Sequence, residues 1–471
     1  MAAAESTVWT WGRAKNYRLG RAFVGTDARV PEKVSGFEGV AVRQAACGGG
    51  HTAVVLADNR LFVFGYSQYG QLGLGDRVDM CDATQVILIP PASVKKAEAA
   101  ISKEGASSSL PVAEVYCGRY HTIARTTTGL VFTWGGGKNG RLGHGDEKIR
   151  AQPTCVESLI SHNAIAITAG YHNNLVLTED GEVWSWGWGA HGQLGLGDTK
   201  DRDIPTAIPE LSHESVCFLS CGDRHSFAIT RDGRVFGWGS NEFGQLGCGK
   251  KGDTVLRPKL IEGLQGLKVI AISSGDRHSA AVTNTGAVYT WGCGSDGQCG
   301  HADFRDVVRP KLVEALVDQF VVDVKCGHNF TMVMNADHEV FAWGNNTYGQ
   351  LGNDGNGKSD MPVKVIINTT ARVSCFSCAH FHCIMWMEVP ETSSTPAMLS
   401  TTRFENASAI DTTKEGDTVD ESRRQVEEAR ERLAALLETY MERQKDCRVT
   451  IEALRMNENL EHNDISAALP F

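Results

Sequence analysis

Pairs of short apolar segments recur along the chain, and a polar turn separates the two members of each pair. The clearest pair spans 226–230 (SFAIT) and 234–238 (RVFGW), with Asp232 and Gly233 between them. Because a tight hairpin turn requires positive φ angles that Asp and Gly tolerate, this pattern predicts a β-hairpin. A Trp-Gly pair and a Gly-Gln-Leu-Gly segment follow, and their glycines allow turns and close backbone approaches.

The same unit recurs at nearly constant spacing. The aromatic residue of the aromatic-Gly pair is Trp11, Phe64, Trp134, Trp186, Trp238, Trp291 and Trp343, with steps of 52 or 53 residues except for one step of 70. Six copies are complete. The seventh is split between 8–12 (VWTWG) and 378–387 (CAHFHCIMWM), so the two ends must meet to complete it. We therefore expect an all-β fold, a seven-bladed β-propeller closed by N- and C-terminal strands.

Composition divides the chain into a propeller and a tail. Residues 1–388 hold the repeats, and the long step reflects an insertion within 91–110 that forms either an acquired functional loop or a tolerated surface loop. Residues 389–417 are rich in Ser, Thr and acidic residues and indicate a disordered linker. A C-terminal α-helix is expected over 418–460, followed by a short tail at 461–471.

Apolar residues in this helix recur every seven positions, as in a coiled coil. The seam consists of Val419, Val426, Leu433, Tyr440, Cys447 and Leu454. Several companion positions are polar, which weakens the seam. One interpretation is a homodimer formed through the helix; the alternative is a solvated helix or one packed against the propeller.

Charge and composition narrow the classes of partner. The formal net charge is −10, with 46 basic and 56 acidic residues, so no nucleic acid and no membrane surface is expected as a partner. No run approaches the roughly 18 apolar residues that span a bilayer. We expect a cytoplasmic protein, with the nucleus left open, and reduced thiols for its 14 cysteines. Cys375 and Cys378 have zinc-ligand spacing, but an alternating strand would separate them, so we expect no metal.

Four motifs recur in fixed order: G-x-x-H-[ST], D-G, W-G and GQLG. The first occurs at 48–52, 118–122, 222–226 and 275–279. This combination resembles the regulator of chromosome condensation repeat over about four fifths of the chain. The resemblance implies a seven-bladed propeller closed by terminal strands. It does not fix the function, because the family includes an exchange factor for the GTPase Ran, an ultraviolet-B photoreceptor and many interaction scaffolds.

Motifs of the specialised members are missing or partial. The photoreceptor uses tryptophans directly after the first glycine of G-x-x-H, whereas those positions here are Gly49, Arg119, Tyr171, Asp223, Asp276, His328 and His380. The basic N-terminal tail and the inserted hairpin of the exchange factor are also absent. Acidic residues on that factor's GTPase-facing surface have counterparts in Asp223 and Asp276, which keeps exchange as an alternative.

No catalytic arrangement stands out, and we expect neither an enzyme in the ordinary sense nor a cofactor. The recurring histidines are interpreted as structural, because a residue repeated in most blades suits a bridge between neighbours better than one active site. They are His51, His121, His225, His278 and His382.

The leading hypothesis is a protein-protein interaction scaffold, and the alternative is a guanine nucleotide exchange factor for a small GTPase. Aromatic and arginine side chains are enriched in binding hot spots. The loops that contain the G-x-x segment are therefore the expected partner-binding face. Its predicted residues are Arg119, Tyr120, Tyr171, Asp223, Arg224, Asp276, Arg277, His328, Asn329, His380 and Phe381.

Overall fold

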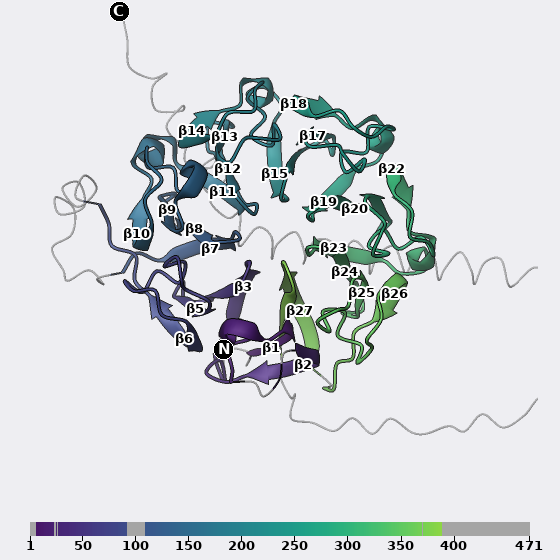
Figure 1. The fold of residues 1–471 in the computed structure, drawn as a ribbon, viewed down its shortest axis with the longest axis horizontal. Coiled ribbons are helices and arrows are strands. Elements are labelled where there is room, and N and C mark those ends of the chain that lie inside the picture. The colour runs from purple at the N-terminus through teal and green to yellow at the C-terminus, as the bar shows by residue number, and fades with distance from the viewer. Residues whose placement is uncertain (1–5, 23–24, 26, 92–108, 370, 389–471) are drawn as a thin grey trace, which may run out of the picture. The chain divides into compact units, whose positions relative to one another are not determined.

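Seven four-stranded antiparallel sheets surround a central axis in the computed structural model (Figure 1). The structure describes the chain except for residues 1–5, 23–24, 26, 92–108, 370 and 389–471. All strands that the structure describes lie within the compact unit 1–390. The predicted linker, C-terminal helix and tail, together with most of the 91–110 insertion, lie outside the described residues and stay predictions.

The first three complete blades follow the chain order. Blade 1 contains β3 (Val42–Cys47), β4 (His51–Leu56), β5 (Leu61–Gly65) and β6 (Met80–Val86). Blade 2 contains β7 (Val112–Cys117), β8 (His121–Thr126), β9 (Val131–Gly135) and β10 (Arg150–Cys155). Blade 3 contains β11 (Ala164–Ala169), β12 (Asn173–Thr178), β13 (Val183–Gly187) and β14 (Arg202–Ala207).

Three further blades repeat this order. Blade 4 contains β15 (Val216–Cys221), β16 (His225–Thr230), β17 (Val235–Gly239) and β18 (Val255–Leu260). Blade 5 contains β19 (Val269–Ser274), β20 (His278–Thr283), β21 (Val288–Gly292) and β22 (Val307–Leu312). Blade 6 contains β23 (Val321–Cys326), β24 (Phe330–Asn335), β25 (Val340–Gly344) and β26 (Ser359–Lys364). Short 3-10 helices connect some strands: η1 (Lys15–Tyr17), η2 (Lys138–Gly140), η3 (Glu157–His162), η4 (Pro209–Leu211), η5 (Glu262–Leu264) and η6 (Glu314–Leu316).

The closing blade joins the two ends of the repeat region. Its strands are β27 (Arg372–Cys378), β28 (His382–Glu388), β1 (Ser6–Arg13) and β2 (Asp27–Val34), in the sheet order β2-β1-β28-β27. Val8 lies opposite Trp386, and Gly12 lies opposite His382. The predicted closure by N- and C-terminal strands is therefore confirmed.

The second strand of each complete blade is buried along its whole length, because neighbouring blades cover both of its faces. The fourth strands form the half-exposed outer rim. Tryptophans of the W-G pairs are fully buried between blades. At the end of β17, Gly239 has a φ of +103°, and a Cβ atom there would lie 2.4 Å from the Arg224 carbonyl oxygen. Glycine is required because the strand end and the loop nearly touch.

At six of the seven junctions between blades, one backbone carbonyl accepts hydrogen bonds from two side chains. Between blades 1 and 2, the Gln71 carbonyl accepts the Trp134 indole N–H at 2.9 Å and the Thr122 hydroxyl at 2.8 Å. The Thr122 oxygen lies 2.9 Å from Nε2 of His51. Since the hydroxyl hydrogen is already donated to Gln71, the imidazole must be the donor and carries its hydrogen on Nε2.

The repeated histidines therefore bridge neighbouring blades, as their recurrence suggested, although they reach side chains rather than backbone groups. The corresponding contacts, each 2.9 Å long, join His121 to Asn174, His225 to Ser279, His278 to Thr331 and His382 to Thr52. Two blades depart from the pattern: Asn173 and Phe330 occupy the histidine position in blades 3 and 6.

Candidate partner interface on the loop face

Seven loops between the first and second strands of the blades converge around the axis, and we call the surface that they form the loop face. They comprise 48–50, 118–120, 170–172, 222–224, 275–277, 327–329 and 379–381. Backbone hydrogen bonds connect adjacent loops, including Arg119 N–H to the Tyr171 carbonyl at 3.1 Å and Asp223 N–H to the Gly275 carbonyl at 3.3 Å. The fold thus holds seven loops in one rigid ring, and six of them carry side chains, because the blade 1 loop consists of Gly48, Gly49 and Gly50.

Two carboxyl groups meet at the axis. Asp223 and Asp276 are both buried, and their side chains are hydrogen-bonded to each other. Burial, followed by the charge of Asp276, raises the pKa of Asp223 to about 7. Asp223 also lies 3.3 Å from Arg224 Nε, and Asp276 lies 3.4 Å from Arg277 Nε and 3.3 Å from His328 Nδ1. Each Asp-Arg ion pair forms within its own loop.

Aromatic rings lie directly beside these carboxyl groups, since His328 contacts both Asp276 and its aromatic neighbours. Tyr171 packs against His380 with ring centroids 4.4 Å apart, and its buried hydroxyl lacks a hydrogen-bond partner among the described residues. His328 stacks on Phe381 at 5.3 Å. Burial lowers the pKa of His380 well below its usual value, so its imidazole is neutral at physiological pH. The axial cluster thus joins an acidic half to an aromatic half.

The predicted face residues all lie around this axis, but they differ in accessibility. Asp223, Asp276 and His380 are buried and are available to a partner only at their edges. The others are half-buried: Arg119, Tyr120, Tyr171, Arg224, Arg277, His328, Asn329 and Phe381. Arginine and aromatic groups, rather than the two carboxylates, are thus the accessible part of the face.

We expect Asp223→Asn to stabilise the protein more at pH 8 than at pH 5. A raised pKa means that the folded state binds a proton that the unfolded state loses between about pH 4 and 7, so this aspartate destabilises the fold as pH rises. Each tenfold change in proton affinity corresponds to about 1.4 kcal/mol. Melting temperatures of both proteins at pH 5 and pH 8 measure the effect. An equal shift at the two pH values would contradict the shared-proton geometry.

A cavity of about 420 Å³ lies beside the axis, at the junction of blades 2 and 3. Its lining comprises Tyr69, Tyr120, Gly136, Lys138, Asn139, Arg141, His172 and Trp188. Of these residues, only Tyr120 was in the predicted set. His172 belongs to the loop face, next to Tyr171, and the others come from loops after third strands, where the repeat pattern alone gave no reason to place them beside Tyr120.

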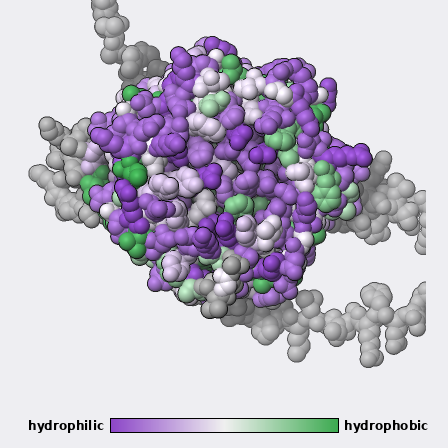
Figure 2. Space-filling view, in the orientation of Figure 1, coloured by the Kyte–Doolittle hydropathy of each residue, from purple (hydrophilic) through white to green (hydrophobic). Residues whose placement is uncertain are grey.

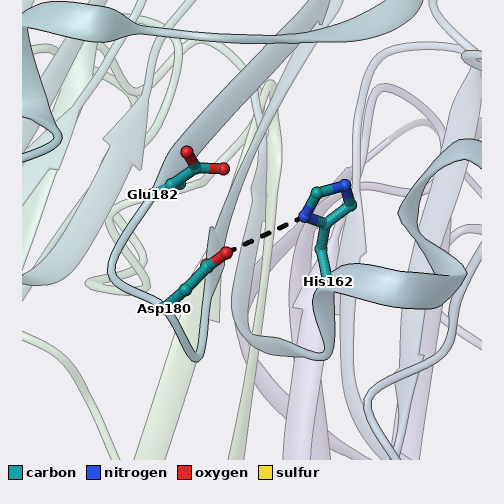
Figure 3. A group of neighbouring side chains, drawn as sticks. All are labelled: His162, Asp180 and Glu182. Atoms are coloured by element: carbon teal, nitrogen blue, oxygen red, sulfur yellow. Dashed lines mark ion pairs between the residues drawn. The ribbon is translucent and has the colours of Figure 1, made fainter.

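An acidic cluster with one histidine lies on the η3 and β12–β13 turns, where His162, Asp180 and Glu182 approach one another (Figure 3). His162 Nδ1 is 3.8 Å from an Asp180 oxygen, and its ring packs on Trp184 at 4.6 Å. The Thr178 hydroxyl also donates to Asp180. These contacts give His162 and Asp180 protein partners, so neither side chain needs an ion to explain its position.

Comparison with known proteins agrees with the blade architecture. A family model for the RCC1-like domain matches residues 1–218, and one for the regulator of chromosome condensation (RCC1) repeat matches 232–282, 285–334 and 337–386. The chain belongs to the RCC1 repeat family. The predicted family is therefore confirmed. RCC1 propellers are generally regulators or exchange factors rather than catalysts, so the family supports an interaction or exchange role without deciding between them.

Among RCC1 relatives, the Arabidopsis thaliana ultraviolet-B receptor UVR8 is 32% identical over 346 residues, covering 73% of this chain and 74% of UVR8. The human E3 ubiquitin-protein ligase HERC2 is 33% identical over 332 residues, which cover 70% of this chain but 6% of HERC2.

Two solved structures share the fold. Human WBSCR16 has a TM-score of 0.70 at 23% identity, covering 81% of this chain and 99% of that one. Prp20p from Saccharomyces cerevisiae, which binds Gsp1p and histones, has a TM-score of 0.69 at 20% identity, covering 83% and 93%. At these identities the likeness supports the fold alone.

Within the described residues, no helix is both long and apolar enough to cross a membrane. The visible side of the propeller is mainly hydrophilic, with small separate hydrophobic patches (Figure 2).

Proposed function

We propose that this RCC1 propeller is a protein-protein interaction scaffold whose loop face binds the partner. The observation that carries the proposal is the collection of half-buried arginine and aromatic side chains on that face. Loops from six of the seven blades contribute, and backbone hydrogen bonds hold the loops together, so little conformational entropy is lost on binding. Large rigid rings and bidentate guanidinium groups are typical of binding hot spots.

Arg224 and Arg277 are the best probes of this face. Arg224 lies 3.8 Å from Glu242, and Arg277 lies 4.8 Å from the centre of the Phe243 ring, so both extend outward from the axial carboxylates. Substitution by glutamate would place another negative charge beside Asp223 and Asp276. Glutamine removes the charge and retains hydrogen-bonding capacity, and it is therefore the better replacement.

Arg224→Gln combined with Arg277→Gln is expected to reduce capture of the protein's partners by about tenfold or more, because two hot-spot cations are lost. Quantitative mass spectrometry after affinity capture from cells measures the change. Arg309→Gln, at an exposed position on the outer strand β22, is the matched control and should retain the partners. Retention of the same partners by the double variant, with an unchanged melting temperature, would refute the proposal.

Nucleotide exchange is the second function to test, because a small GTPase is one class of protein partner for such a face. The specific observation in its favour is the acidic pair of Asp223 and Asp276 at the axis. These are the residues that the family resemblance pairs with acidic residues on the GTPase-facing surface of the exchange factor. If a GTPase is captured, release of a fluorescent nucleotide from it should accelerate with the wild-type protein. If a GTPase is captured but its nucleotide release is not accelerated, the exchange function is refuted and the scaffold function is retained.

A further inference from the structure

A buried arginine distinguishes the second blade from most of the others. The second residue of the Gly-Gln-Leu-Gly segment is glutamine in five blades: Gln71, Gln193, Gln245, Gln298 and Gln350. At the same position the second blade has Arg141, and the closing blade has Arg18. Each glutamine accepts a hydrogen bond from the backbone two residues earlier, as in Tyr69 N–H to Gln71 Oε1 at 3.0 Å. Arginine has no acceptor, so this local role is lost.

The Arg141 guanidinium has few protein partners. Its side chain is only 3% exposed, and it donates from Nε to the Lys138 carbonyl at 2.7 Å and from Nη2 to Asn139 Oδ1 at 3.4 Å. Among the described residues, no carboxylate lies within ion-pair distance of it. Burial lowers the pKa of Arg141 to about 10. A buried charge without a counter-ion is costly, which points to an anion supplied from outside.

The nearest acidic groups serve the rim of the pocket. Glu147 accepts the Asn139 backbone N–H at 3.1 Å, and Asp201 accepts the Asn139 side-chain amide at 2.8 Å. Glu147 and Asp201 thus fix the η2 turn through Asn139, and neither forms an ion pair with Arg141. Arg141 therefore remains directed to the cavity that it lines, with the exposed Lys138 at the rim.

Four aromatic rings form the walls of this cavity. Tyr69 and Tyr120 lie 4.9 Å apart, Tyr120 and His172 6.3 Å, and His172 and Trp188 5.5 Å. Arg119 lies 5.2 Å from the centre of the Tyr120 ring. Burial, followed by the charges of Arg141 and Arg119, lowers the pKa of His172 to about 2, so the imidazole adds an uncharged wall.

Arg18 provides an internal comparison. It is also buried and donates from Nε to the Lys15 carbonyl at 2.7 Å, but its Nη1 reaches the Gly49 carbonyl at 3.1 Å. It does not line the cavity. Arginine replaces glutamine in both blades, but the two side chains have different surroundings. Arg18 has an additional backbone partner in the closing blade, whereas Arg141 faces an aromatic cavity in the second blade.

We propose that the pocket at the junction of blades 2 and 3 binds a phosphotyrosine side chain of a protein partner, with Arg141 as counter-ion of the phosphate. A carboxylate of Asp or Glu would leave the aromatic walls without contact, whereas a phenyl ring packs against them. The two cations that line the pocket, Arg141 and Lys138, match the charge of nearly −2 on a phosphate. Guanidinium groups bind phosphate through paired hydrogen bonds. The inference rests on the proposed scaffold function and specifies one of its contacts.

The test is direct binding of a short fluorescent peptide with Gly and Ser flanks around one phosphotyrosine, measured by anisotropy with the full-length protein. We expect saturable binding, and at least about tenfold weaker binding of the matched tyrosine and phosphoserine peptides, because each lacks the phosphate or the ring. Phenyl phosphate should compete with the peptide. Equal binding of the tyrosine peptide, or tighter competition by AMP than by phenyl phosphate, would overturn the proposal.

Arg141→Gln restores the residue that five other blades carry, so the fold should be preserved. The 141 carbonyl, which accepts the Trp186 indole at 3.1 Å and the Asn174 amide at 2.8 Å, is unaffected. We expect at least about tenfold weaker peptide binding for Arg141→Gln and unchanged binding for Arg18→Gln, the matched control. Unchanged binding of the Arg141 variant would refute the assignment of this site. The capture experiment with Arg224 and Arg277 is independent, so either proposal can fail alone.

Discussion

Deletion of residues 1–20 is expected to lower the melting temperature by about 10 °C or more, or to prevent recovery of soluble protein. The deletion removes β1, an inner strand of the closing sheet that pairs with both β2 and β28. It also removes Trp11, which is fully buried and whose indole donates to the Gln350 carbonyl at 2.9 Å in the neighbouring blade. Loss of one buried Trp side chain alone costs about 3–5 kcal/mol. The exposed edge of β28 would then favour aggregation.

The control is deletion of residues 2–5, which ends before β1. This variant should melt within a few degrees of the wild type, by differential scanning calorimetry at matched concentration. Trp11→Ala should fall between the two deletions, because the strand pairing is retained while the side-chain contacts are lost. If the protein without residues 1–20 melted like the wild type, the ring would not depend on its N-terminal strand.

Acid is expected to unfold the propeller cooperatively about one to two pH units below 6.5, the normal histidine pKa. Burial lowers the pKa values of His51, His121 and His278 to about 3 and that of His225 to about 4. Each folded-state pKa is depressed, so stability is complete above about pH 6.5 and is lost as pH falls toward 4 because the unfolded chain takes up the protons. Four such histidines together remove more than about 5 kcal/mol per pH unit once the unfolded state is fully protonated. Asp223 acts in the opposite direction over part of this range, but it accounts for only one proton.

Urea unfolding at closely spaced pH values between 5 and 7 gives the number of protons taken up. For the wild type, we expect it to approach about four or more at the lower end. His225→Asn places there the residue that blade 3 carries as Asn173, and should reduce the uptake by about one proton. A proton uptake near zero in the wild type would mean that the histidines are accessible to water in the folded state.

The propeller was predictable because its pattern is local and repeated. Asp232 and Gly233 indicated a hairpin turn without any knowledge of distant contacts, and the split repeat required Val8 to pair near Trp386. The face residues were also predictable as a set, because every blade places its G-x-x loop at the same end of the sheet. Whether they bind a partner stays a prediction.

Side-chain direction within the face was not predictable. Asp223 and Asp276 are 53 residues apart, and no local pattern shows that their carboxyl groups meet at the axis. Arg141 did leave a signal, since it replaces the glutamine of five other blades. Interpretation of that change required the position of the Trp188 loop, which comes from the next blade.

The circular pairing of the chain has a consequence for its synthesis on the ribosome. Strand β1 leaves the exit tunnel first, but its partner β28 ends at Glu388 and is made only after every other strand of the ring. The first-made strand must therefore wait with an unpaired edge while the intervening blades fold. A chain stalled before Glu388 would be a natural client for chaperones that cover exposed strand edges, whereas in the finished ring β28 covers this edge of β1.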